Sequence, residues 1–114
     1  MKKSTTLTLA LLLASLDFGV SASTSMGKVI SCWVHNTQDN SFIFMVDGQK
    51  ERPACASFGS PHGRYAVDMN TDKGRLIASA IMAAKASASV VYVHGKGTCE
   101  LYSDSEDVYH VAVH

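Results

Sequence analysis

Four of the five histidines lie at or near the ends of segments that favour β-strands: His35, His94, His110 and His114. Imidazole is a common ligand of zinc and copper, so convergent histidines would suit either metal. The spacing of these four does not fix them on one face of a fold. We therefore predict no metal site and no cofactor, and we expect His35 and His94 to end strands at the surface.

Two other segments have compositions found in binding loops. Gly95-Lys96-Gly97-Thr98 lacks the preceding glycine spacing of a phosphate loop, and no helix follows it, so it predicts a hairpin turn. Asp104, Glu106 and Asp107 lack the glycine and regular spacing of a calcium loop, so we expect a solvated acidic turn. The sequence contains no Ser-His-Asp order, nucleophile elbow or recognisable carboxylate pair, and we predict that the protein is not an enzyme.

Aromatic rings and short polar side chains are the remaining groups with binding chemistry. They are Trp33, Tyr65, Tyr92, Tyr102 and Tyr109, together with Asn36, Gln38, Asn40 and several serines. Flat apolar faces next to hydrogen-bonding groups suit the recognition of sugars. Trp33 and Tyr109 alternate with core-type residues, so these two rings are expected to pack inside the fold.

The chain has three cysteines, Cys32, Cys55 and Cys99, which allow three different pairings. Loop length separates these pairings poorly. Cys32 lies within an apolar run, where a free thiol behaves as a small hydrophobe, whereas the other two lie in polar, turn-like segments. This context favours a disulfide between Cys55 and Cys99, with Cys32 free.

The first 22 residues are typical of a secretory signal peptide. Lys2 and Lys3 precede an apolar run, Leu7–Leu16, and Val20-Ser21-Ala22 has small residues suited to cleavage. The apolar run covers about ten residues, whereas a membrane-spanning helix needs about 20. We predict cleavage after Ala22, a single mature domain over residues 23–114, and a secreted or periplasmic location, where disulfides persist.

The elements that must position these residues follow from the hydrophobic pattern. Strands are predicted over Lys28–His35, Ser41–Asp47, Tyr65–Met69, Val90–His94 and Val108–Val113, and one helix over Arg75–Ala88. Asn70 or Thr71 provides the N-cap of the helix. A mainly β chain with one helix between strands three and four has the connectivity of the OB-fold, a small five-stranded barrel.

Charge balance narrows the classes of partner. Ten Lys and Arg residues are matched by ten Asp and Glu, and 46% of the residues are hydrophobic. This composition is that of a globular protein with no cationic field, so we predict neither nucleic-acid binding nor membrane insertion. A domain this small buries limited surface, which favours a disulfide or an oligomer as additional support.

One face of the predicted helix is small rather than charged, with Ser79, Ala83, Ala86 and Ser87 on it. High helix propensity explains these residues in one interpretation. In the other, the small side chains permit close approach by a second helix.

Several segments in order carry a resemblance to a known family. They are Val29-Ile30-Ser31, Pro53-Ala54-Cys55-Ala56, the strand Arg64–Met69, Ala83-Ala84-Lys85-Ala86-Ser87 leading into Val90-Val91-Tyr92-Val93, and Gly97-Thr98-Cys99. In this layout the mature chain resembles the B subunits of bacterial toxins of the subtilase-cytotoxin, typhoid-toxin and pertussis-like group. The resemblance implies a homopentamer of OB-fold subunits, with the helices around a central pore, that binds host-cell glycans.

The same resemblance implies where a sugar would bind. By position, Ser25 and Lys28 match the segment just before the first strand in that family, and Lys50 lies in the following loop. Relatives that bind sialic acid use a basic side chain on the strand after the helix, where this chain has Val91 and Tyr92, so sialic acid is not the predicted ligand.

Two hypotheses of different classes follow. In the first, the protein is a secreted, non-enzymatic virulence subunit that attaches a toxin-like complex to host glycans and carries a separate catalytic subunit. In the second, it is a stand-alone periplasmic OB-fold protein that binds or inhibits a protein partner.

Overall fold

The computed structural model describes residues 22–35, 40–48, 51–58 and 62–114. The predicted signal peptide, except Ala22, lies outside these residues. The elements are β1 (Thr24–Val34), β2 (Ser41–Val46), β3 (Arg64–Asp68), α2 (Asp72–Ser87), β4 (Val90–Gly95) and β5 (Glu106–Val113). The prediction of a mainly β chain with five strands, and one helix between the third and fourth, is confirmed for the described part of the chain. No helix within that part has the length and apolar character needed to cross a membrane.

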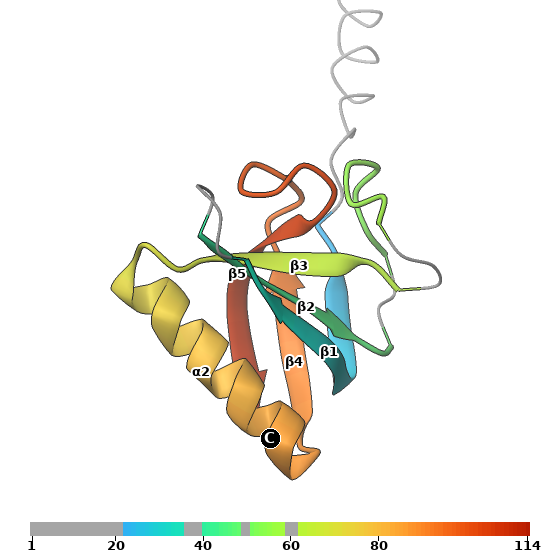
Figure 1. The fold of residues 1–114 in the computed structure, drawn as a ribbon. Helices are drawn as coiled ribbons and strands as arrows, with labels where there is room; N and C mark the ends of the chain where they lie inside the picture. The colour runs from blue at the N-terminus through green and yellow to red at the C-terminus, as the bar shows by residue number, and fades with distance from the viewer. Residues whose placement is uncertain (1–21, 36–39, 49–50, 59–61) are drawn as a thin grey trace, which may run out of the picture.

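The five strands pair in one closed circuit, β1-β2-β3-β5-β4 (Figure 1). β3 and β5 run parallel, with Tyr65 opposite Glu106, and the other neighbours run antiparallel. Because each strand has a paired neighbour on both sides, the circuit leaves no strand as a free edge.

β1 begins four residues earlier than the predicted strand because it pairs with two neighbours in succession. Thr24 to Lys28 pair with β4, and the strand from Val29 onward pairs with β2, with a bulge between Val29 and Ser31. The first half of β1 has no run of β-branched residues. Its strand conformation is fixed by the partner strand rather than by local preference.

The helix α2 begins at a side-chain cap and ends at a left-handed residue. The Thr71 hydroxyl accepts a hydrogen bond from the Gly74 amide at 2.9 Å, and Ala88 has φ 56°. Ala78, Ile81 and Ala84 form its buried face and pack against the strands. A Cβ at Gly74 would lie 1.7 Å from the Asp68 carbonyl oxygen, so this close approach requires glycine.

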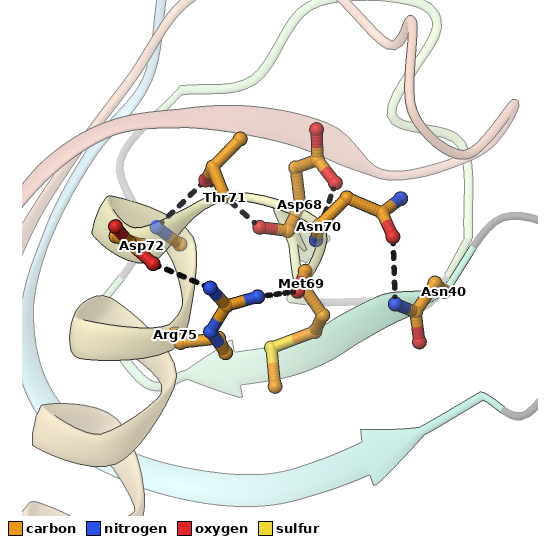
Figure 2. A network of polar contacts seen from close by, with 8 residues as sticks. Asn40, Asp68, Met69, Asn70, Thr71, Asp72 and Arg75 are labelled. Carbon is orange, nitrogen blue, oxygen red and sulfur yellow. Dashed lines mark hydrogen bonds and ion pairs between the residues drawn. The ribbon is translucent and has the colours of Figure 1, made fainter.

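Polar contacts fix the junction between β3 and α2 (Figure 2). The Asp68 carboxylate accepts from the Asn70 amide, and the Thr71 hydroxyl donates to the Asp68 carbonyl. Arg75 pairs with Asp72 and donates to the Met69 carbonyl. Asn40, just before β2, adds a hydrogen bond from its side-chain amide to the Asn70 side chain, so the turn is held both by its own groups and by a neighbouring segment.

The core is one cluster of buried side chains from all five strands and from α2. Phe42, Phe44, Tyr65 and Ile81 are among its largest members and are fully buried. The rings of Phe44 and Tyr65 stack with centroids 5.4 Å apart.

A disulfide joins Cys55 to Cys99, as the sequence context predicted, with their Cα atoms 6.1 Å apart. It links the β2–β3 and β4–β5 connections, which lie at one end of the sheet (Figure 1). Disulfides persist mainly outside the cytosol, so the bond indicates a non-cytosolic compartment. Cys32 is free and half-buried, and burial raises the pKa of its thiol against the opposing effect of Lys85.

Candidate functional site

Four ring side chains contact one another on the outer surface of β4 and β5. They are Tyr92, His94, Tyr109 and His110, and we call them the ring ladder. The His94 and His110 rings lie parallel with centroids 5.3 Å apart, and Tyr92 lies 5.9 Å from His110. Tyr109 meets both histidines edge to face, at 5.7 and 5.3 Å.

Strand geometry explains how the ring ladder forms. Val91 and Val93 point into the core, so the alternating residues Tyr92 and His94 lie on the opposite face. His94 is paired with His110 across the strands, and the register shifts next to it. Tyr109 is the extra residue in that shift, and its side chain is 64% exposed. The expectation that Tyr109 packs inside the fold was therefore wrong, because the bulge breaks the alternation.

The neighbouring part of β1 extends this surface. Met26 pairs with Tyr92 and is 56% exposed, and Lys28 pairs with Val90 and is also exposed. Lys28, which the resemblance placed in a sugar site, thus lies at the surface one strand away from the ring ladder. The combination offers flat apolar faces, imidazole nitrogens and one ammonium group on a single side of the sheet.

Two other predicted site residues do not join this surface. Ser25 is 1% exposed, and its hydroxyl lies 2.7 Å from the Tyr65 hydroxyl inside the fold. Its alternation along β1 points it inward, so it cannot touch an external sugar, and the candidate surface is corrected to exclude it. Lys50 lies outside the described residues.

Only part of the ring ladder could be predicted from the sequence. The sequence identifies Tyr92 as one of five candidate sugar-binding rings, whereas the spacing of the histidines does not fix them on one face. Pairing of β4 with β5 brings His94 and His110 together, and a pairing register is not visible in the spacing along the chain. Across the described ranges, no group of three or more His, Cys, Asp or Glu side chains is arranged to hold a metal ion.

A second ring cluster surrounds Arg64 at the start of β3. The guanidinium carbon lies 3.6 Å from the Phe58 ring centroid, 5.2 Å from that of Trp33 and 5.6 Å from that of Tyr102. Arg64 also pairs with Asp104 at 2.8 Å. Cation–π contacts and the ion pair together tie β1, the β2–β3 connection and the turn before β5 to one buried side chain.

Electrostatics at this cluster follow from the ion pair. Burial alone would raise the pKa of the Asp104 carboxyl, but hydrogen bonds from Arg64 and Ser105 and the Arg64 charge outweigh it, so the pKa lies below its ordinary value. Arg64 Nε and His35 Nε2 are buried without a hydrogen-bond partner among the described residues. Because Arg64 is itself covered by rings, this cluster is better suited to holding the connections together than to receiving a ligand.

A cavity of about 450 Å³ lies between β3, the first turn of α2 and the β4–β5 connection. Charged residues line it, among them Lys73, Lys96 and Asp107. The Asp107 carboxylate is already engaged, since it accepts from the Thr98 hydroxyl and from the amides of Glu100 and Leu101 at 2.6 to 3.1 Å.

The sequence predicted a solvated acidic turn at Asp104, Glu106 and Asp107, and this prediction was wrong because Glu106 and Asp107 are the first two residues of β5. Glu106 and Asp107 are buried, and both carboxylates accept hydrogen bonds from backbone amides of the turn after β4. In that turn the Lys96 amide donates to the Asp107 carbonyl of β5, and the two carboxylates accept from the amides of Gly97, Glu100 and Leu101, which places these N–H groups in hydrogen bonds as well. Only Asp104 of the three retains substantial exposure.

Comparison with protein-family models, with curated proteins and with solved structures found no significant match for this chain. Any functional assignment therefore depends on the side chains and surfaces described above.

Proposed function

We propose that the protein is an exported, non-enzymatic glycan-binding subunit of a toxin-like complex, and that its closed five-stranded sheet is an OB-fold barrel. The observation that carries the proposal is the ring ladder beside Met26 and Lys28. Sugars are bound by stacking on flat apolar faces and by hydrogen bonds to hydroxyl groups. A single exposed face of the sheet presents both kinds of group.

The connectivity supports the OB-fold part of the proposal. The strand order β1-β2-β3-β5-β4, with the helix between β3 and β4, is that expected of this small barrel. OB-folds bind oligosaccharides and oligonucleotides. The chain has a formal net charge of zero, which favours a neutral sugar over a polyanion.

The outer face of α2 supports assembly with further copies of the same chain. Leu76 is 70% exposed, Met82 is also exposed, and the small residues Ser79 and Ala83 lie close to them in the sequence. Large apolar side chains beside small ones allow another helix to approach closely. A homopentamer would cover this face and would multiply individually weak sugar contacts, because linked sites raise avidity without any new contact.

The experiment is a glycan array probed with the mature protein, residues 23–114, and with Tyr92→Ala and His110→Ala. We expect binding to neutral, hydroxyl-rich glycans and a loss of signal of about tenfold, or 1.4 kcal/mol, in each variant. His114→Ala removes another exposed imidazole without touching the ring ladder and serves as the control. Binding that survives both ring-ladder substitutions would overturn the assignment of the site.

Native mass measurement tests the assembly separately. We expect a ring for the mature protein and monomers for Leu76→Glu, because a charge in a helix–helix contact would be desolvated without a partner. Ser103→Glu adds the same charge at an exposed position of the β4–β5 connection and should leave the mass of the assembly unchanged. A monomer that stays folded and binds no glycan would favour the stand-alone periplasmic protein instead.

A further inference from the structure

Glu106, the first residue of β5, has a fully buried carboxylate whose main partner is Ser23. The Ser23 amide nitrogen donates to Oε2 at 3.0 Å, and the Ser23 hydroxyl donates to Oε1 at 2.5 Å. The Gly97 amide donates to Oε2 at 2.9 Å. In the part of the chain that the structure describes, no lysine, arginine or histidine forms an ion pair with Glu106.

A buried carboxylate without a positive partner is costly. Neutral hydrogen bonds recover part of the lost hydration, but an ionised group removed from water is stabilised best by an opposite charge with donors in good geometry. The site around Glu106 has the donors and lacks the charge. It also holds the carboxylate closely, since a Cβ at Gly95 would lie 2.0 Å from Oε2.

Ser23 is the residue that leader removal would place at the N-terminus. Hydrolysis of the Ala22–Ser23 amide by a leader peptidase consumes one water: Ala22 leaves as a carboxylate, and the Ser23 nitrogen becomes a free amine that takes up a proton at neutral pH. The nitrogen already 3.0 Å from Glu106 then carries a positive charge and three donors. Charge-assisted hydrogen bonds are roughly twice as strong as neutral ones.

The rest of Ser23 is fixed independently of its nitrogen. Its hydroxyl lies 2.7 Å from the Tyr65 hydroxyl, and its carbonyl accepts from the Gly95 amide at 2.9 Å. Its side chain is fully buried. Tyr65 and Gly95 both lie within residues 23–114, so the mature chain retains these contacts.

We propose that the Glu106 carboxylate binds the α-ammonium group of Ser23, so that removal of the leader completes a buried ion pair and stabilises the mature fold. Tyr65 and Gly95 position Ser23 through its hydroxyl and carbonyl, and the Gly97 amide positions the Glu106 carboxylate. The inference rests on the proposed function only in requiring export with cleavage after Ala22. Glycan binding and ring assembly play no part in it.

The test is a cycle of four proteins that begin at residue 23: the free amine and the N-acetylated form, each with Glu106 and with Glu106→Gln. All elements of the described fold lie within residues 24–113, so these chains keep the whole domain. Acetylation should raise the equilibrium constant of unfolding roughly 10- to 100-fold with Glu106, and less than about twofold in the Glu106→Gln background. Glu100→Gln makes the same change at an exposed position and is the control, so acetylation should destabilise this variant as much as it does the wild type. Equal effects of acetylation with and without the Glu106 carboxylate would overturn the proposal.

A second measurement covers the case in which Glu106→Gln does not fold. Mass spectrometry follows acetylation of the native mature protein by acetic anhydride, and the Ser23 amine should react at least about tenfold more slowly than in the unfolded chain. An equal rate of acetylation in the folded and the unfolded chain would exclude the ion pair between Ser23 and Glu106. The N-terminus of the exported protein, read by mass, should be Ser23. A different first residue would overturn this inference while leaving glycan binding untouched.

Discussion

His94 of β4 and His110 of β5 occupy paired positions on neighbouring strands, and their rings lie within 9° of parallel. Tyr92 and Tyr109 contact the same pair, so the four rings form a continuous surface rather than isolated side chains. A surface of this kind contributes little to the core, because Val91 and Val93 on the opposite face carry the packing. In the proposed function, this surface contacts the sugar.

The ring ladder should therefore be separable from stability. Tyr92→Ala is expected to lower the free energy of unfolding by less than about 1 kcal/mol, the upper range for one cross-strand aromatic pair. Urea denaturation measures this value, and Phe44→Ala, which empties a fully buried position, should lose about 3–5 kcal/mol in the same assay. A loss at Tyr92 as large as that at Phe44 would identify the ring as part of the core.

The disulfide should provide a large share of the stability of so small a domain. Replacing both Cys55 and Cys99 by serine opens a loop with a sequence separation of 44 and should reduce the free energy of unfolding by about 3–4 kcal/mol. Cys32→Ser, which alters a half-buried free thiol, should lose about 1 kcal/mol or less. Chemical denaturation of the wild type and the two variants compares these effects, and similar losses in both variants would contradict the assignment.

The pair between Arg64 and Asp104 should matter more than the pair between Arg75 and Asp72. Asp104→Asn leaves a buried guanidinium without its charge partner, so we expect a loss of about 1–3 kcal/mol. Asp72→Asn affects an exposed pair, and the loss should be less than about 1 kcal/mol. Urea denaturation at pH 7 compares the two losses of unfolding free energy. An equal loss for Asp72→Asn and Asp104→Asn would contradict this prediction.

The Arg64–Asp104 pair also predicts a pH dependence. The folded-state pKa of Asp104 is lowered, so its contribution to stability is fully present above the titration range of an unfolded aspartate, about pH 4. It is lost as the pH falls through the lowered pKa. The stability difference between the wild type and Asp104→Asn should therefore be constant from about pH 7 to about pH 5 and should narrow below about pH 4. A difference that grows on acidification would contradict this sign.

Gly74 should be intolerant of substitution although it lies inside a helix. Helix propensity alone predicts that Gly74→Ala gains about 1 kcal/mol. The added Cβ would meet the Asp68 carbonyl oxygen and force the β3–α2 junction apart, so we expect a net loss of about 1–3 kcal/mol. Ser79→Ala, on the exposed side of α2, is the control and should be neutral or slightly stabilising. Thermal unfolding distinguishes the outcomes, and a stabilised Gly74→Ala would show that the junction can relax.

The central parts of the elements could be predicted from local pattern. The β-branched and aromatic run Val90–His94 predicted β4, and helical spacing from Leu76 to Ala84 predicted α2, each to within a few residues. Thr71 was one of two predicted caps. The ends of the elements could be predicted less well. β5 starts at Glu106 rather than Val108, because its first residues pair with β3 across a long stretch of sequence.

Local sequence determined the strands, the helix, the favoured cysteine pair and the presence of rings suited to sugars, because side-chain periodicity, capping and polarity act between near neighbours. Tertiary structure alone decided that Ser25 faces inward, that Glu106 meets Ser23 in the interior, and that His94 and His110 share one surface. These relationships depend on which strands pair and in which register. A pairing register is set by the packing of the whole closed sheet, and no residue spacing along the chain records it.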